Sequence, residues 1–267
     1  MDTIVIAGGI PERNDPLFAF SQGRPKAMIN IQGQPMICWV LNGLADAKLV
    51  DNLIVVGIDS VAEQGEIQQR VKQSLTFLPN KGGLVNNGLA GLEHVYHMHG
   101  RHVPVIGCSS DIPHMQGYMV DDLIGRCQPL DRVLYYAVIT PETMQSAYPN
   151  ADRTYANFRG EKLTGCDIFV SNTRILHTNQ KLWQAMINAR KNPLAMAWQI
   201  GFGSLLRLAL RRMSLDDAAR LAGEKLEDEQ PIGLVYSPYA ELAMDGDKPH
   251  QIEILREPRG MNPAAKQ

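Results

Sequence analysis

The sequence has few cysteines and no long apolar run. Its four cysteines are scattered without a CxxC pair, so they indicate neither a zinc site nor a disulfide framework. No apolar run is long enough to span a bilayer, and no basic segment followed by an apolar one opens the chain. These absences predict a cytoplasmic location and no membrane partner.

Strong charge of either sign is also lacking. The net charge of −2 over 267 residues gives no reason to expect a nucleic-acid partner. No internal repeat or low-complexity tract interrupts the chain. With 45% hydrophobic and 20% charged residues, the composition is typical of a globular protein with enough length for one large α/β domain or one domain with an insertion.

Two phosphate-binding fingerprints are missing, yet the first residues suit a triphosphate. Neither the Walker pattern GxxxxGK[ST] nor GxGxxG is present. Instead, the apolar run from Thr3 to Ala7 predicts a buried strand that ends in Gly8-Gly9, and Arg13 and Lys26 follow. Backbone N–H groups in a glycine turn, together with two cations, can bind phosphates. An ordinary strand and turn of an α/β protein is the alternative.

The order of the pieces adds a family resemblance. Ala7-Gly8-Gly9, Arg13, Pro25-Lys26 and the segment from Gly33 to Ile37 follow one another. This order resembles the N-terminus of nucleotidyltransferases of the nucleotide-diphospho-sugar transferase superfamily, in particular the molybdenum-cofactor guanylyltransferases and similar NTP transferases. The chain departs from that pattern at Pro11, where glycine is usual. The resemblance implies a three-layer α/β/α, Rossmann-like domain with a mixed, mostly parallel sheet.

The resemblance also implies a magnesium site. Asp111-Ile112-Pro113 follows the predicted strand Val103 to Cys108 and matches the family's DxP segment, whose aspartate holds the magnesium of the triphosphate. The residues alone favour Asp111 as a helix N-cap, because an Asp before a helix usually has that role. Near the end of the chain, Asp247 resembles the family's second magnesium ligand. Asp245 competes for that role, because strand alternation would place both on one face, and a polar turn is the alternative.

Lys26, Arg13 and Asp111 are therefore the predicted catalytic residues, and nucleotide contacts are predicted from the glycine turn and from a second polar loop. The predicted nucleotide-binding residues are Ala7, Gly8, Gly9, Arg13, Lys26, Gly83, Asn86, Asn87 and Gly88. The two asparagines have the donors and acceptors that base recognition needs. They could instead cap a helix predicted to start at Leu89.

An acceptor site is predicted further along the chain. The segment from Thr140 to Phe158 is polar and reads as a loop that could form a wall of this site. Arg153, Arg159 and Lys162 follow one another closely and could hold a phosphate on the acceptor. They are also the cations that a solvated surface loop carries.

The domain organisation combines one nucleotidyltransferase domain with an insertion. Residues 1–178 and 227–257 are predicted to form that domain, residues 179–226 a C-terminal helical insertion of about three helices packed on it, and residues 258–267 a tail. The apolar residues of the insertion could form an interface between copies of the chain, so a homo-oligomer is possible.

The predicted function is magnesium-dependent transfer of a nucleoside monophosphate from an NTP to a small phosphorylated acceptor, with release of pyrophosphate. Two alternatives stand beside it. One is a glycosyltransferase of the same fold, which would release no pyrophosphate from an NTP. The other is a non-catalytic nucleotide-binding protein.

Overall fold

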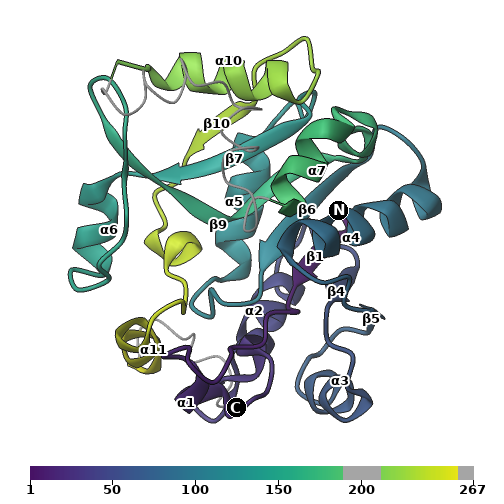
Figure 1. The fold of residues 1–267 in the computed structure, drawn as a ribbon, viewed down its shortest axis with the longest axis vertical. Coiled ribbons are helices and arrows are strands. Elements are labelled where there is room, and N and C mark those ends of the chain that lie inside the picture. The colour runs from purple at the N-terminus through teal and green to yellow at the C-terminus, as the bar shows by residue number, and fades with distance from the viewer. Residues whose placement is uncertain (189–211, 258–267) are drawn as a thin grey trace.

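An eight-stranded sheet is the centre of the computed structural model, which describes residues 1–188 and 212–257 (Figure 1). The strands are β1 Thr3–Ile6, β2 Asn30–Ile31, β3 Gln34–Pro35, β4 Leu53–Val56, β5 Leu75–Leu78, β6 Pro104–Ser109, β7 Leu134–Ile139, β8 Ala156–Asn157, β9 Lys162–Asn172 and β10 Gly233–Tyr236. β2 and β3 form a separate two-stranded sheet.

The helices alternate with these strands through most of the chain. The α-helices are α1 Phe18–Ser21, α2 Met36–Ala45, α3 Val61–Gln68, α4 Leu84–His99, α5 Gly117–Arg126, α6 Pro141–Ala147, α7 Gln180–Asn188, α10 Leu215–Lys225 and α11 Pro249–Arg256. The 3₁₀ helices are η1 Lys26–Met28, η2 Thr173–His177 and η3 Ala240–Ala243.

The strand order of the main sheet is β10-β7-β9-β6-β1-β4-β5, and β8 pairs with β9. β9 runs antiparallel to β6, β7 and β8, whereas the other pairs are parallel. The predicted mixed, mostly parallel sheet is therefore confirmed. Figure 1 shows α10 beside β10 at one end of the molecule and α3 beyond β5 at the other.

Burial explains why the central strands carry no polar alternation. All four residues of β4 are buried, and its neighbour β1 is nearly as enclosed. A strand covered on both faces needs apolar side chains in both directions, so its sequence is a continuous run. The runs that predicted β1, β4 and β6 have this origin.

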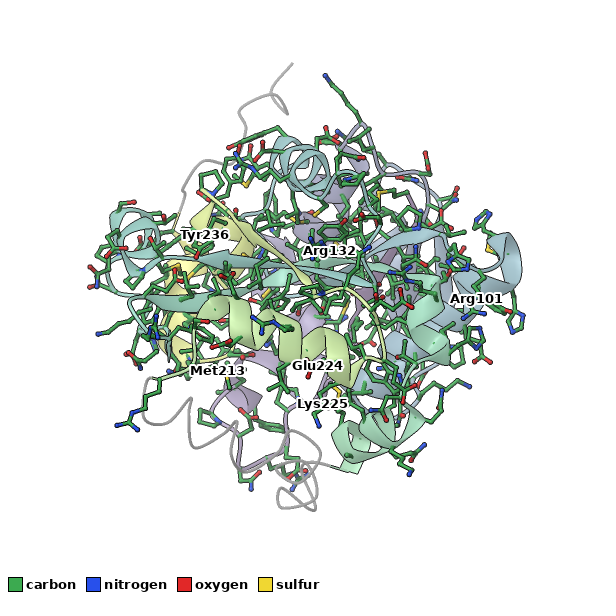
Figure 2. All side chains as sticks on the ribbon, turned by 90° about the horizontal axis from the view of Figure 1, so that it is seen from above. Arg101, Arg132, Met213, Glu224, Lys225 and Tyr236 are labelled. Atoms are coloured by element: carbon green, nitrogen blue, oxygen red, sulfur yellow. The ribbon has the colours of Figure 1, made fainter. Side chains whose placement is uncertain are left out.

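Two apolar clusters cover the two faces of the sheet and make three layers. On one face, side chains of α2, α5 and α11 pack against Val5, Val55 and Ile168. On the other, α4, η2 and α7 pack against Ile4 and Ile54. Figure 2, seen from above, shows α10 nearest the viewer, with Glu224 and Lys225 labelled near its C-terminal end.

The structure corrects two boundaries. α4 begins at Leu84 with Gly83 as its N-cap, so Asn86 and Asn87 lie in the first helical turn and cap nothing. The predicted loop after Thr140 contains α6: the Thr140 side chain accepts a hydrogen bond from the Thr143 N–H, and Pro141 occupies the first turn, where its missing N–H costs nothing.

The predicted helical insertion is described at its two ends. α7 and α10 are helical, and Leu182 of α7 and Leu226 after α10 belong to the apolar cluster that includes Ile4 and Ile54. α10 begins with the predicted Ser214 cap, which exchanges hydrogen bonds with Asp217. Residues 189–211 and the predicted tail 258–267 lie outside the described residues.

Within residues 1–188 and 212–257, no helix has the length and apolar character required to cross a membrane.

Candidate active site

The glycine turn after β1 is held against the end of β4. The Ala7 N–H donates to the Val56 carbonyl at 2.9 Å. Gly57 has φ of 111°, and a Cβ atom there would lie 2.5 Å from the Gly8 Cα atom. The two chain segments can approach this closely because both residues are glycine. The close approach fixes the backbone of Gly8 at the carboxyl edge of the sheet.

Amide side chains hold the same turn from the other side. Asn80 Nδ2 donates to the Gly8 carbonyl at 3.1 Å, and Asn87 Nδ2 donates to Asn80 Oδ1 at 3.2 Å. Asn87 is 1% exposed, and its Oδ1 accepts from the Lys81 N–H. Asn86 Nδ2 donates to the Lys81 carbonyl at 3.2 Å. These bonds shape the loop, and a base contact of Asn86 and Asn87 stays a prediction.

Lys26 places its ammonium between two carboxylates. Its backbone N–H donates to the Gly9 carbonyl at 2.8 Å, which ties η1 to the glycine turn. Its Nζ atom forms ion pairs with Asp111 and Asp247, and the side chain is 20% exposed. Burial alone would lower the pKa of the ammonium, but the two carboxylates outweigh burial and raise that pKa. Lys26 is therefore charged in this environment.

Asp111 lies just beyond β6 and is held in place by one local and one long-range hydrogen bond. Its Oδ1 atom accepts from Ser109 Oγ, and its backbone carbonyl accepts from the Gly246 N–H at 3.1 Å. α5 begins at Gly117 with Gln116 as N-cap, so Asp111 caps no helix. The bond from Gly246 brings the segment that contains Asp247 against the end of β6. Asp247 lies 136 positions after Asp111 in the sequence.

Asp245 and Asp247 do not share a face. They lie between η3 and α11 in a segment without strand structure, so the predicted alternation does not apply. The Asp245 carboxylate forms an ion pair with Arg153, whereas Asp247 contacts Lys26. The exposed fractions of the two side chains also differ, at 9% for Asp245 and 62% for Asp247. Asp247 therefore faces the open side of the site.

Asp167 of β9 is a site residue that sequence reasoning missed. Arg153 Nη2 lies 3.7 Å from Asp167 Oδ2, so one guanidinium faces both Asp167 and Asp245. Among the described residues, Asp167 Oδ2 and Asp245 Oδ1 are buried without a hydrogen-bond donor. Burial raises the pKa of Asp167 to about 8, and Asp111 and Asp245 add to the effect while Arg153 opposes it. Burial likewise raises the pKa of Asp245, with Arg153 again opposing it.

The charges of the carboxylates near Lys26 and Arg153 indicate whether a metal ion could bind there. In the described part of the chain, Asp111 and Asp247 pair with the Lys26 ammonium, and Arg153 pairs with Asp245 and lies near Asp167. A triphosphate would add more negative charge, so a further cation is needed to balance it. No three His, Cys, Asp or Glu side chains in the described ranges form a metal-binding group by themselves. Magnesium commonly takes one or two carboxylates and completes its shell with phosphates and water, so Asp111 and Asp247 fit it.

The other predicted site residues lie farther from Lys26, Asp111 and Asp247. Arg13 is exposed in the turn after the glycines, and Gly83 caps α4 on the surface. Arg159 and Lys162 are exposed in the β8–β9 hairpin. Lys162 precedes Asp167 by five positions, which is roughly 16 Å along β9. The structure therefore unites Lys26, Asp111 and Asp247, and joins Arg153 to Asp245, but leaves Arg159 and Lys162 at a distance.

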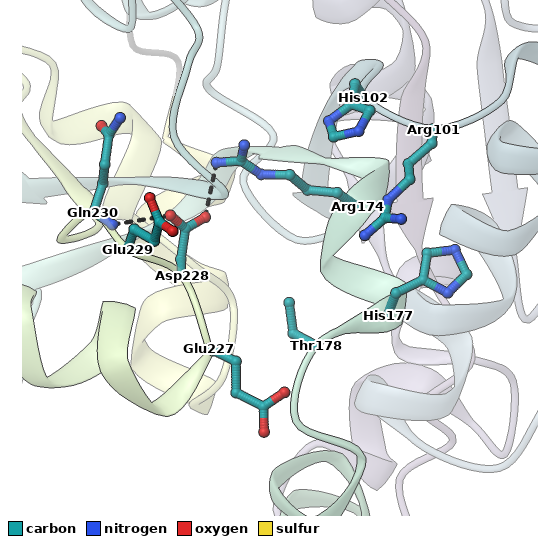
Figure 3. Close-up of a pocket in the computed structure, with 9 residues that line it drawn as sticks. All are labelled: Arg101, His102, Arg174, His177, Thr178, Glu227, Asp228, Glu229 and Gln230. Atoms are coloured by element: carbon teal, nitrogen blue, oxygen red, sulfur yellow. Dashed lines mark hydrogen bonds and ion pairs between the residues drawn. The ribbon is translucent and has the colours of Figure 1, made fainter.

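A pocket of about 340 Å³ lies at the opposite edge of the sheet (Figure 3). Arg101 and His102 precede β6, Arg174 follows β9, and Asp228 precedes β10, so these residues gather at the amino ends of β6 and β10. Arg174 Nη2 forms an ion pair with Asp228 at 2.7 Å. Open α/β sheets bind substrates at the carboxyl ends of their strands, which favours the Lys26 side.

The comparison with protein families decides the assignment. The family described as "MobA-like NTP transferase domain" matches residues 3–230. The chain belongs to this family. It is therefore a nucleotidyltransferase, as the order of its N-terminal motifs predicts. No curated protein matches the chain.

Solved structures agree with the fold of this NTP transferase. A hypothetical transferase from Thermus thermophilus is 28% identical, with a TM-score of 0.75, and the match covers 94% of this chain and 98% of that one. A 4-diphosphocytidyl-2C-methyl-D-erythritol synthase from Anaerococcus prevotii shares 11% identity and a TM-score of 0.59, covering 96% and 93%. A CMP:2-keto-3-deoxy-manno-octonic acid synthetase complexed with CTP is 17% identical, with a TM-score of 0.56. That match covers 96% of this chain and 96% of the other. The last two likenesses support the fold alone.

Proposed function

We propose that this NTP transferase moves a nucleoside monophosphate from an NTP to a small phosphorylated acceptor, with magnesium as its cofactor. The observation that carries the proposal is the meeting of Lys26, Asp111 and Asp247 beside the glycine turn. The family membership supports transfer from an NTP. The acceptor class and the metal are proposals from charge and position. A cytoplasmic location and a homo-oligomer stay predictions.

In the proposed reaction, an oxygen of the acceptor phosphate attacks the α-phosphorus of the NTP. The bond from that phosphorus to the α–β bridging oxygen breaks, and pyrophosphate leaves. Such a transfer needs positioning and charge neutralisation, with no protein nucleophile. Magnesium held by Asp111 and Asp247, when bound, would neutralise phosphate oxygens and orient the triphosphate.

The protein's own residues supply the remaining parts. Backbone N–H groups of Gly8 and Gly9 would face the triphosphate, and Lys26 would neutralise charge that grows on the leaving pyrophosphate. Arg13, in the exposed turn, could close over the phosphates. Arg153 is occupied by two carboxylates, so we assign it to positioning Asp245, while Arg159 and Lys162 remain candidates for the distal end of the acceptor.

The test is pyrophosphate release from each of the four NTPs with magnesium and a panel of phosphorylated sugars and alcohols. We expect one NTP and acceptor pair to support turnover. Lys26→Ala and Asp111→Asn should each reduce it about 10²–10³-fold, the scale of losing one transition-state contact. Lys72→Ala is the matched control, because that lysine is 75% exposed and pairs with Asp46 on the surface.

Three outcomes would contradict the proposal. Wild-type turnover in Lys26→Ala would remove the role of the N-terminal segment. Sugar transfer from a nucleotide-sugar without pyrophosphate release would favour the glycosyltransferase alternative. NTP binding without turnover on any acceptor would favour the non-catalytic one.

A further inference from the structure

The Lys26 ammonium lies at the point where the proposed magnesium ligands converge. Asp111 comes from the middle of the chain and Asp247 from its last described segment, and both form ion pairs with the same Nζ atom. The Gly246 N–H bond to the Asp111 carbonyl holds the two segments together independently of that lysine. The two carboxylates are therefore already positioned around a cation, and that cation is a side chain of the protein.

We propose that Lys26 is a built-in counter-ion that keeps the divalent-cation site closed until a nucleoside triphosphate arrives. The triphosphate draws the ammonium away from Asp111 and Asp247, and the divalent cation takes its place between the carboxylates. The cation thus enters with the triphosphate and binds weakly before it. This inference rests on the proposed function, because it uses the same site.

The attachment of Lys26 allows this exchange. Its backbone N–H is fixed to the Gly9 carbonyl, so the residue stays beside the glycine turn while its side chain moves. A lysine side chain carries its charge on a flexible four-carbon stem, which lets Nζ swing between the carboxylates and nearby phosphates. The phosphates that Gly8 and Gly9 would bind are therefore within the range of the same side chain.

Burial explains why the Asp111 carboxylate needs a cation at all times. The Asp111 side chain is 8% exposed, and an unpaired charge there would be costly. Asp247 is 62% exposed, which leaves the site open to an entering ion on that side. Because the Lys26 ammonium already pairs with both carboxylates, an entering cation has to displace it to contact them both.

The test measures Mn²⁺ binding without any nucleotide, by the electron paramagnetic resonance signal of free Mn²⁺. The wild-type protein should bind Mn²⁺ weakly. Lys26→Met removes the counter-ion, and its Mn²⁺ affinity should rise about tenfold or more, within the range by which neighbours of metal ligands change affinity. The matched control Lys72→Met should bind as the wild type does. Adding Asp247→Asn to Lys26→Met should abolish the gain.

Several results would overturn the inference. Tight Mn²⁺ binding by the wild-type protein, or equal affinities of wild type and Lys26→Met, would show that Lys26 does not exclude the ion. Lys26→Gln, which is neutral but can still donate hydrogen bonds to both carboxylates, replaces Lys26→Met if the latter fails to fold. The assay contains no NTP and measures no turnover. Absent pyrophosphate release would therefore overturn the proposed function while leaving this measurement readable.

Discussion

Asp167 lies where an ionised carboxylate is disfavoured. Burial raises its folded-state pKa to about 8, whereas the unfolded value is about 3.9. Between these values the folded protein binds a proton that the unfolded chain releases. The contribution of Asp167 to stability is therefore fully present below about pH 4 and is lost as the pH rises through about 8.

Asp167→Asn should remove this pH dependence, since asparagine has a similar shape and cannot ionise. We expect the free energy of unfolding of the variant, relative to wild type, to increase from pH 5 to pH 8.5 in urea titrations. Asp46→Asn, at an exposed surface position, is the control and should follow the wild-type profile. Parallel profiles of wild type and Asp167→Asn would show that Asp167 is ionised throughout.

Some site residues could be predicted from the sequence, and others could not. The family's motif order predicts Lys26 and Asp111 as site residues, and the structure pairs their side chains. The motif order could not reveal Asp167, a residue within β9 that none of the quoted motifs includes. Its role depends on Arg153 and Asp245, and distant residues meet only through the tertiary fold. The same holds for Asn80, whose bond to Gly8 links two loops.

The environment of Lys26 cannot be seen in the sequence. A lysine beside a glycine turn is expected to be solvated and free to bind phosphates. The Lys26 ammonium is instead mostly buried between two carboxylates. Removing one partner of a buried pair leaves the other charge uncompensated. Turnover of Lys26→Ala should therefore be measured at a temperature where circular dichroism shows the variant folded.

At the scale of elements, helix α4 packs on β1 through a glycine. A Cβ atom on Gly91 would lie 2.4 Å from Ile4 Cγ2, an atom next to the β-strand backbone that cannot swing away. Gly91→Ala should therefore destabilise the protein by about 1–3 kcal/mol through overpacking, despite the better helix propensity of alanine. Urea unfolding measures this difference.

Gly65→Ala in α3 is the matched control. A Cβ atom there would meet no atom within 4 Å, so the propensity gain stands alone. The variant should be about 0.5–1 kcal/mol more stable than wild type. If Gly91→Ala gained stability as well, the close packing of α4 on β1 would be wrong.

Elements with a long apolar pattern were predictable, and polar ones were less so. The runs behind β1, β4, β6 and β7 reflect burial on both faces, which the sequence shows directly. The start of α4 was misplaced because Asn86 and Asn87 resemble caps, while the actual N-cap is Gly83 with φ of 125°. α6 was missed because its proline and polar residues resemble a loop.

At the scale of the whole molecule, the site joins distant parts of the chain. Gly8 and Lys26 come from the first 30 residues, Asn87 and Asp111 from the middle, and Asp247 from the last described segment. Their contacts to one another exist only in the folded domain. A ligand of this site therefore binds the native state and raises the stability of the entire domain.

A thermal-shift panel of the four NTPs with magnesium should reveal that ligand. At a hundredfold excess over its dissociation constant, a triphosphate adds about 2.7 kcal/mol, which corresponds to about 5–10 °C in a domain of this size. Asp111→Asn should reduce the shift, and Lys72→Ala should leave it unchanged, because Lys72 lies on the surface away from the site. A shift with nucleotide-sugars and none with any NTP would contradict an NTP donor. The thermal shift ranks the four NTPs by their affinity for the native state. The NTP with the largest shift is therefore the donor to use in the pyrophosphate assay.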